Sequence, residues 1–210
     1  MKSFYILGVG DNTAVYIDLL EDLGHEIAGL SHYEESRIGE DYLGHSINIS
    51  NKELLQRKDL SDYNFALSMG DNDVRAELAK EIRAKGGGVP TLIHPAAVVS
   101  KYALLDEGVV IHANATIQAG SQIKNDSVVS ANAVVIHKAV VSSGCYIAAN
   151  ATIGADVNLG VGVFIGLGAV IASKKVSIIA EKTVVGAGAI VIRDVEETSV
   201  LVGNPAKQIK

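Results

Sequence analysis

The hydrophobic positions after residue 96 repeat every six residues. Cut into sixes from Ala97, thirteen consecutive hexads carry an aliphatic residue at the third place and Ala, Ser, Cys or Val at the first. The third-place residues are Val99, Leu105, Ile111, Ile117, Ile123, Val129, Val135, Val141, Ile147, Ile153, Leu159, Ile165 and Ile171. This period fits neither an α-helix nor an alternating strand, and it predicts a solenoid with short strands on its sides.

Three such strands would close a triangular coil of 18 residues. The third-place side chains would point inward, the small first-place residues would fit near the corners, and Gly, Asn and Asp at the hexad ends would supply turns. The pattern slips by two residues around "KKVSIIAEK" and resumes at Ile179, Val185 and Val191, which predicts a two-residue insertion at a corner. We expect about five coils, spaced ~4.8 Å apart.

The first part of the chain has a different pattern. Short apolar runs at 4–7, 25–30 and 63–70 predict strands, and periodic segments at 13–23 and 74–85 predict helices. Strands that alternate with helices favour a parallel sheet. The sequence therefore predicts a small Rossmann-like α/β domain over residues 1–94 and an all-β solenoid over residues 95–210.

Composition and charge exclude several function classes. The chain has 18 Lys and Arg against 24 Asp and Glu, without a basic stripe, so we expect no nucleic-acid partner. No run approaches ~18 uninterrupted apolar residues, which predicts a cytoplasmic protein with no membrane span. Cys145 is the only cysteine, so neither an intramolecular disulfide nor a multi-cysteine zinc cluster can form, and we interpret it as a small buried residue.

Three landmarks accompany the hexads, in order: "GVGDN" after the first strand, "SMGDNDVR" with "TLIHPAAVVS" at the domain junction, and "VGNPAK" near the end. Together they resemble the NeuD/PglD-type sugar acyltransferases, which are hexapeptide-repeat enzymes with a left-handed β-helix. The resemblance covers essentially the whole chain. It implies a homotrimer that uses acetyl-CoA to acetylate a nucleotide-linked amino sugar or a sialic-acid-like sugar for polysaccharide biosynthesis.

By position, the resemblance makes His137 the general base and the amide of Ala155 the donor to the oxyanion. The 18-residue coil independently places Ala155 beside His137. A neutral imidazole can take the proton released when a sugar amine or hydroxyl attacks a thioester. The family often has an acid next to the base, where this chain has Ile136 and Lys138; Lys138 would either pair with Asp156 or contact an anionic acceptor.

The resemblance also implies binding residues. Gly168, Gly186 and Ala187 would supply the corners along which the pantetheine chain of acetyl-CoA lies, unless they are only turn residues. The acceptor would contact Gly8, Gly10, Asn12, Ser31, His32, Lys138 and Tyr146. Gly8 and Gly10 would let a phosphate approach the backbone at a helix N-terminus. Tyr146 stands where many relatives carry a second histidine, and we expect no metal.

Two other functions stay open on the sequence alone. O-acetylation of a sialic-acid-like sugar would use the same machinery, with Lys138 meeting a carboxylate. A non-catalytic trimeric scaffold that binds a sugar nucleotide is the alternative from a different class, motivated by the missing acid beside His137. Release of the free thiol of coenzyme A would separate enzyme from scaffold.

Overall fold

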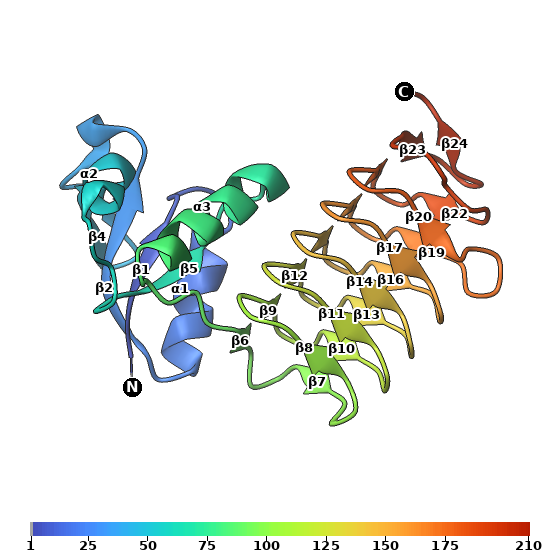
Figure 1. Ribbon diagram of the computed structural model, residues 1–210, viewed down its shortest axis with the longest axis horizontal. Coiled ribbons are helices and arrows are strands. Elements are labelled where there is room, and N and C mark those ends of the chain that lie inside the picture. Colours follow the sequence, from blue (N-terminus) through green and yellow to red (C-terminus); the bar gives the residue numbers. More distant parts are fainter. Residues whose placement is uncertain (1) are drawn as a thin grey trace. The chain divides into compact units, whose positions relative to one another are not determined.

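The computed structural model describes residues 2–210, which form two compact units divided between Leu92 and Ile93 (Figure 1). Strand β6 (Leu92–Ile93) already belongs to the solenoid, because it pairs within the sheet that contains β9 (Val110–Ile111). The backbone N–H of His94 then donates to the carbonyl of Ile111 at 2.9 Å. The solenoid thus starts slightly before residue 95, where the change in composition of the sequence predicts its start.

The N-terminal unit is a five-stranded sheet with helices, as the alternation predicts. Its strands are β1 (Ser3–Leu7), β2 (Glu26–His32), β3 (Asp41–Tyr42), β4 (His45–Ser50) and β5 (Asn64–Leu67). Its helices are α1 (Thr13–Asp22), the short 3-10 turn η1 (Glu35–Arg37), α2 (Asn51–Gln56) and α3 (Asn72–Ala84). The order is β3-β4-β2-β1-β5, parallel except for the antiparallel pair β3 and β4.

Sequence reasoning missed the segment from β3 to α2, although it carries two local signals. Leu43 and Gly44 join β3 to β4 with φ values of 52° and 80°, as a tight hairpin turn requires. The hydroxyl of Ser50 accepts the N–H of Glu53 at 3.1 Å and so caps α2. A serine three residues before a glutamate is the sequence signature of such a helix start.

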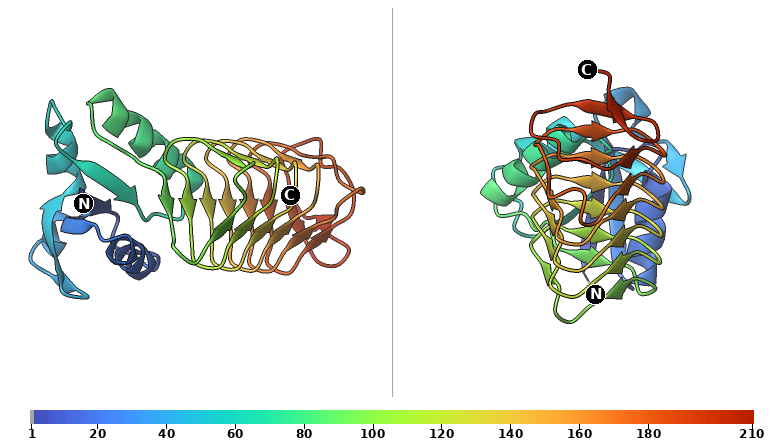
Figure 2. Two further views of the ribbon diagram at one scale, coloured as in Figure 1. Left: turned by 90° about the horizontal axis from the view of Figure 1, so that it is seen from below. Right: turned by 90° about the vertical axis from the view of Figure 1, so that its right-hand side faces the viewer.

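The C-terminal unit is a solenoid of three parallel sheets, and Figure 2 shows its coils stacked one behind another. The six-stranded sheet contains β7 (Val98–Val99), β10 (Thr116–Ile117), β13 (Val134–Val135), β16 (Thr152–Ile153), β19 (Val170–Ile171) and β22 (Ile190–Val191). The five-stranded sheet contains β8 (Leu104–Leu105), β11 (Gln122–Ile123), β14 (Val140–Val141), β17 (Asn158–Leu159) and β20 (Ile178–Ile179).

The third sheet has eight strands and closes the triangle. It contains β6 and β9, then β12 (Val128–Val129), β15 (Tyr146–Ile147), β18 (Phe164–Ile165), β21 (Val184–Val185), β23 (Val200–Val202) and β24 (Lys207–Gln208). Strand β24 is antiparallel to β23 and folds the C-terminal tail back along the last coil. The architecture is the predicted left-handed β-helix.

Strand register confirms the period and the slip. Val135 pairs with Ile117 below it and with Ile153 above it, each 18 residues away. Ile171 instead pairs with Val191, and Leu159 with Ile179, both 20 residues away. The two-residue insertion therefore lies after Ile171, in the corner before β20.

The packing of the hexads follows from their composition. From Ile111 to Val191 every third-place aliphatic is at most 3% exposed, and the small first-place residues, including Cys145, are buried beside them. From Gly108 to Gly188 the sixth place takes the left-handed conformation, mostly at Gly, Asn or Asp as expected. Burying this continuous column of aliphatic side chains is the main force that holds the coils together.

Three glycines let one coil sit unusually close to the next. A Cβ atom on Gly154, Gly160 or Gly166 would lie 2.4–2.6 Å from backbone atoms of the following coil. All three occupy the fourth place of successive hexads in the coil that precedes the insertion. Backbone cannot move aside as a flexible side chain can, so only glycine fits at these places.

The insertion forms an expanded corner over residues 172–177. Val176 turns back into the core, where it is 2% exposed, and its N–H donates to the carbonyl of Ala172 at 3.1 Å. The carboxylate of Asp194 accepts the N–H groups of Ser177 and Ile178 at 2.5 and 3.2 Å. The corner is therefore anchored at both ends.

A buried histidine near the start of the solenoid makes its stability depend on pH. Burial lowers the pKa of His112 to about 4, and nearby His94 adds to the effect, whereas a histidine in an unfolded chain titrates near pH ~6.5. The unfolded state then binds more protons between these values. The free energy of unfolding should fall by up to ~3 kcal/mol as the pH drops through this window.

Denaturant titrations at several pH values between 7.5 and 4.5 check this prediction. The wild-type curve should lose stability toward acid, and His112→Gln should lose the part of that slope that the imidazole causes. An identical pH dependence in the two proteins would contradict the assignment.

Candidate active site

His137 lies in the turn between β13 and β14, with its side chain exposed. Two contacts fix its backbone: the N–H donates to the side-chain oxygen of Gln118 at 3.1 Å, and the carbonyl accepts the N–H of Asp156 at 3.2 Å. Within residues 2–210 the imidazole itself makes no hydrogen bond. The ring is thus held at its base and is open to a ligand at its tip. Sequence reasoning missed Gln118.

The coils place three residues in one column at this corner. His137, Ala155 and Ser173 each lie two residues after a strand position, and those positions, Val135, Ile153 and Ile171, pair in register. Adjacent coils in such a stack are ~4.8 Å apart. Ala155 is therefore one coil from His137, and Ser173 is one coil further.

The amide of Ala155 is already hydrogen-bonded. It donates to the hydroxyl oxygen of Ser173 at 2.8 Å. Both residues are half-buried. An oxyanion donor at this amide would therefore compete with Ser173, a residue that sequence reasoning missed although it follows Ala155 by one coil.

Lys138 does not form the expected ion pair with Asp156; in the described part of the chain, neither side chain has a charged partner. The left-handed backbone at Lys138, with φ 57°, directs its stem toward the preceding coil. There a Cβ on Gly120 would lie 3.3 Å from the Cγ of Lys138. The absence of that Cβ leaves room for the stem, and the ammonium group stays exposed beside the candidate base.

The residues predicted to hold the coenzyme lie on a different corner. Gly168, with φ 65°, and the pair Gly186 and Ala187 fall in the turns from the eight-stranded to the six-stranded sheet. His137 and Ala155 fall in the turns from the six-stranded to the five-stranded sheet. Within one chain the two groups therefore flank opposite edges of the six-stranded sheet.

Tyr146 is not brought to the His137 corner within one chain. It lies in β15 of the eight-stranded sheet, where its half-buried ring stacks on Phe164 with ring centroids 5.5 Å apart and an angle of 19° between the planes. The spacing of nine residues from His137 is half a coil, which puts the two residues on different sides of the triangle. Tyr146 could meet His137 only through another copy.

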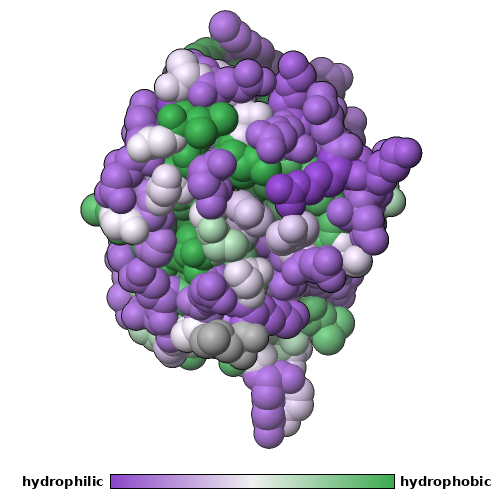
Figure 3. Space-filling model, turned by 90° about the vertical axis from the view of Figure 1, so that its left-hand side faces the viewer, coloured by the Kyte–Doolittle hydropathy of each residue, from purple (hydrophilic) through white to green (hydrophobic). Residues whose placement is uncertain are grey.

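The N-terminal unit contains a pocket with a volume of about 530 Å³. It opens at the carboxyl ends of the parallel strands, where α/β sheets bind ligands. Its lining includes Gly8, Val9, Gly10, Asp11, Asn12, His32, Tyr33, Asn51, Ser68, Met69, Gly70, Val74 and Leu78. The face of this unit in Figure 3 is mostly hydrophilic, with hydrophobic areas between the polar groups.

The hydroxyl groups of Thr13 and Ser68 hold the turn after β1 in place by hydrogen bonds. The carbonyl of Gly8 accepts the hydroxyls of Thr13 and Ser68 at 3.0 and 2.5 Å, and the N–H of Gly10 donates to the hydroxyl of Thr13 at 2.8 Å. The Gly10 amide, predicted to meet a phosphate, is thus occupied within the turn. Gly8 has φ 87°, a conformation that favours glycine.

The end of β2 presents hydrogen-bond donors to the pocket. The Nδ1 atom of His32 accepts the N–H of Glu34 at 3.1 Å, so the neutral ring carries its proton on Nε2. Arg37 Nη1 lies 3.3 Å from that Nε2 and donates to the carbonyl of Val9 at 3.3 Å. Two donors therefore lie close together, of which His32 lines the pocket and Arg37 does not. Arg37 was missed by sequence reasoning.

Ser31 supports this wall without lining the pocket. Its hydroxyl donates to the side-chain oxygen of Asn51 at 2.6 Å, and the side chain of Ser31 is buried. Asn51 does line the pocket, so Ser31 positions a lining residue while its own side chain lies behind the wall. The missed helix α2 contributes Asn51 as its first residue.

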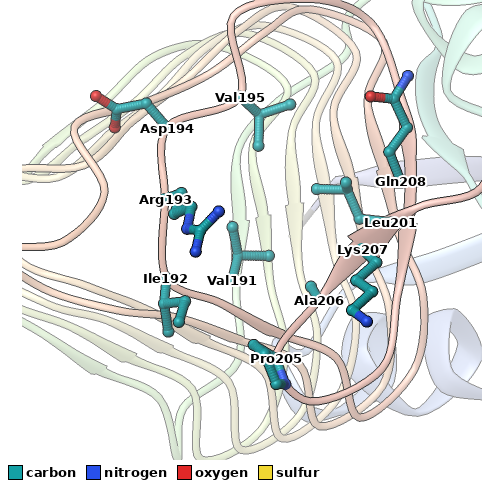
Figure 4. A pocket seen from close by; sticks show the side chains of 10 residues that line it. All are labelled: Val191, Ile192, Arg193, Asp194, Val195, Leu201, Pro205, Ala206, Lys207 and Gln208. Carbon is teal, nitrogen blue, oxygen red and sulfur yellow. The ribbon is translucent and has the colours of Figure 1, made fainter.

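A second cavity of 390 Å³ lies at the C-terminal end of the solenoid. Figure 4 shows Arg193 pointing into it and Asp194 pointing away. The core residues Val191 and Leu201 form part of its lining, together with Pro205 of the tail. This cavity is the partly covered end of the core, and it contains none of the predicted site residues.

Across residues 2–210, no three His, Cys, Asp or Glu side chains gather closely enough to hold a metal ion. None of the helices described for this chain has the length and apolar character needed to cross a bilayer.

The fold has close counterparts among solved structures. The acetyltransferase domain of PglB from Neisseria gonorrhoeae FA1090 matches over 100% of both chains with a TM-score of 0.91 and 25% identity, and a structure of that domain with acetyl coenzyme A matches with a TM-score of 0.89. A histidine-to-asparagine variant of perosamine N-acetyltransferase from Caulobacter crescentus, in complex with CoA and GDP-perosamine, matches over 100% of this chain and 97% of its own, with a TM-score of 0.91 and 28% identity.

Over its whole length the chain is therefore similar to acetyltransferases of solved structure, one of them a sugar N-acetyltransferase. A curated protein, UDP-N-acetylbacillosamine N-acetyltransferase from Bacillus subtilis (strain 168), is 42% identical to this chain over 57 residues. That match spans 27% of this chain and about a quarter of the relative's length. No family model matches the sequence.

Proposed function

We propose that this chain transfers the acetyl group of acetyl-CoA to the amino group of a nucleotide-linked amino sugar. The observation that carries the proposal is the full-length match to two acetyltransferase structures, the PglB domain with acetyl coenzyme A and the perosamine N-acetyltransferase with CoA and GDP-perosamine. Both units of the chain take part in that match. A donor site on the solenoid and an acceptor pocket in the N-terminal unit would serve the two substrates.

The reaction would proceed by direct attack. The amine nitrogen of the sugar forms a bond to the thioester carbonyl carbon, and His137 takes the proton that the nitrogen loses. The tetrahedral intermediate then collapses, the carbon–sulfur bond breaks, and the imidazolium returns the proton to the leaving sulfur. The products are the acetamido sugar and free coenzyme A. The exposed imidazole, fixed at its backbone, suits this role.

The acceptor's nucleotide would bind in the 530 Å³ pocket. Asn12 immediately precedes α1, whose N-terminus favours negative charge. At the other side, His32 lines the pocket and its Nε2–H offers a donor to an acceptor atom of the nucleotide. A hydrogen-bond donor at this wall suits a base or ribose oxygen.

The coenzyme would lie between copies of the chain. Gly168, Gly186 and Ala187 occupy one corner of the triangle, while His137 occupies another. A closed homotrimer would bring the first corner of one copy next to the second corner of its neighbour. This arrangement supports a shared active site, three to a trimer, with the pantetheine chain between the two corners.

Release of the coenzyme A thiol, measured with a panel of acceptors, tests the proposal. We expect turnover with at least one nucleotide-linked amino sugar and an acetamido product. Turnover only with a sialic-acid-like sugar would favour O-acetylation, for which the exposed ammonium of Lys138 offers a partner to the carboxylate. Binding of acetyl-CoA and nucleotide sugars without any release would favour a scaffold.

A further inference from the structure

The hydrogen bond between Ala155 and Ser173 assigns a further group to the reaction. We propose that the hydroxyl of Ser173, polarised by the Ala155 amide, donates the hydrogen bond to the thioester oxygen as it becomes an oxyanion. The inference rests on the proposed function and names a catalytic residue for it. Nothing in the hexad pattern distinguishes Ser173 from other corner residues.

The bonding at the corner leaves one donor unused. The Ala155 amide has a single hydrogen, which it directs to the Ser173 oxygen at 2.8 Å. The hydroxyl of Ser173 carries its own hydrogen, and no acceptor for it lies among the residues that the structure describes. Since Ser173 is only half-buried, that hydrogen can point outward to a bound acyl group.

A hydroxyl that accepts a hydrogen bond from an amide becomes a better donor, because hydrogen bonds in a chain polarise one another. Donors that are fixed before the reaction stabilise a developing oxyanion without reorganisation. For the amide to reach the oxyanion directly, the hydroxyl of Ser173 would have to move away, and the existing hydrogen bond would be lost. If the hydroxyl donates to the oxyanion instead, the amide keeps its hydrogen bond to the hydroxyl oxygen and the oxyanion still receives a hydrogen bond.

The local structure holds Ser173 in this position. A Cβ on Gly154 would lie 2.5 Å from the backbone nitrogen of Ser173, so this glycine admits the close approach of the two coils. Ser173 opens the expanded corner, which Val176 anchors by burial in the core and Asp194 anchors by its two backbone hydrogen bonds. The hydroxyl therefore sits on a fixed corner and not on a loose loop.

Three variants test the inference with an acceptor that the wild-type protein acetylates. Ser173→Ala should lower kcat by ~10- to 100-fold, at the lower end of the effect of losing an oxyanion donor because the freed amide replaces part of it. The KM for acetyl-CoA should stay within about threefold. Ser173→Thr keeps a hydroxyl and should restore most of kcat. Ser143→Ala removes a half-buried corner serine from a different side of the solenoid and should change neither constant.

An unchanged or increased kcat in Ser173→Ala would overturn the inference, because the amide would then act directly. Infrared spectra of bound acetyl-CoA with a ¹³C carbonyl give a readout that needs no acceptor. The carbonyl band should shift to lower frequency on binding to the wild-type protein, and Ser173→Ala should lose part of that shift. Carbonyl bands at the same frequency in the wild-type protein and in Ser173→Ala would contradict the proposed role of the Ser173 hydroxyl. A wild-type protein that acetylates no acceptor would instead overturn the proposed function.

Discussion

Replacing His137 by alanine should lower kcat/KM for the amino-sugar acceptor by ~10²- to 10⁴-fold, the usual contribution of a positioned general base. The fold should survive, because the imidazole is exposed and its backbone contacts to Gln118 and Asp156 do not involve the side chain. Steady-state release of the coenzyme A thiol measures the loss. Unchanged thermal unfolding and acetyl-CoA binding would place the defect in the chemical step.

A second histidine provides the control for this experiment. His45 lies in β4 of the N-terminal unit, where its ring contacts Glu21 at 3.2 Å, and it lines neither the pocket nor the His137 corner. His45→Ala should leave kcat/KM within about twofold. A wild-type rate in His137→Ala would remove this residue from the mechanism and leave the base to be found elsewhere.

Replacing Leu159 by alanine should lower the free energy of unfolding of the solenoid by ~2–5 kcal/mol, as for other buried leucines. Its side chain is 1% exposed in the central column of aliphatic residues. The coils above and below are held by backbone pairing, so they cannot fully collapse into the cavity. Denaturant titration monitored by circular dichroism measures the change.

The matched control is Leu104→Ala in the same five-stranded sheet. Leu104 occupies the second place of its hexad and is 59% exposed in the single chain. Its truncation should cost less than ~1 kcal/mol. Equal losses in the two variants would mean that third-place residues do not carry the stability of the solenoid.

The sequence predicts the solenoid well because one physical requirement recurs in every hexad. Each third place needs an aliphatic side chain that points inward. Because the requirement recurs so often, a deviation at one position does not hide the six-residue period. The two-residue insertion is also visible in the sequence, as a shift of that period. The N-terminal unit gives weaker signals. Its strand and helix alternation is visible, but β4 and α2 depend on a hairpin and a capping serine at Ser50, each of which occurs once.

The site is harder to predict because its chemistry depends on where side chains point. The period places Ala155 next to His137, yet it does not reveal that Ser173 accepts the Ala155 amide. Charge complementarity suggests a pair between Lys138 and Asp156, but a left-handed backbone and the space above Gly120 direct the lysine stem to the other side. Arg37 reaches His32 from a segment without periodicity, so no pattern marks it.

The expanded corner after Ile171 has a consequence for how the chain finds its native arrangement. A stack of identical coils could pair one coil out of step and still bury most of its aliphatic side chains, as any self-similar array can. The coil with 20 residues in place of 18 has no equivalent elsewhere in the stack. After such a shift, Val176 and the three glycines at 154, 160 and 166 would face the wrong neighbouring residues. This single irregularity therefore selects one register for the pairing of all the coils.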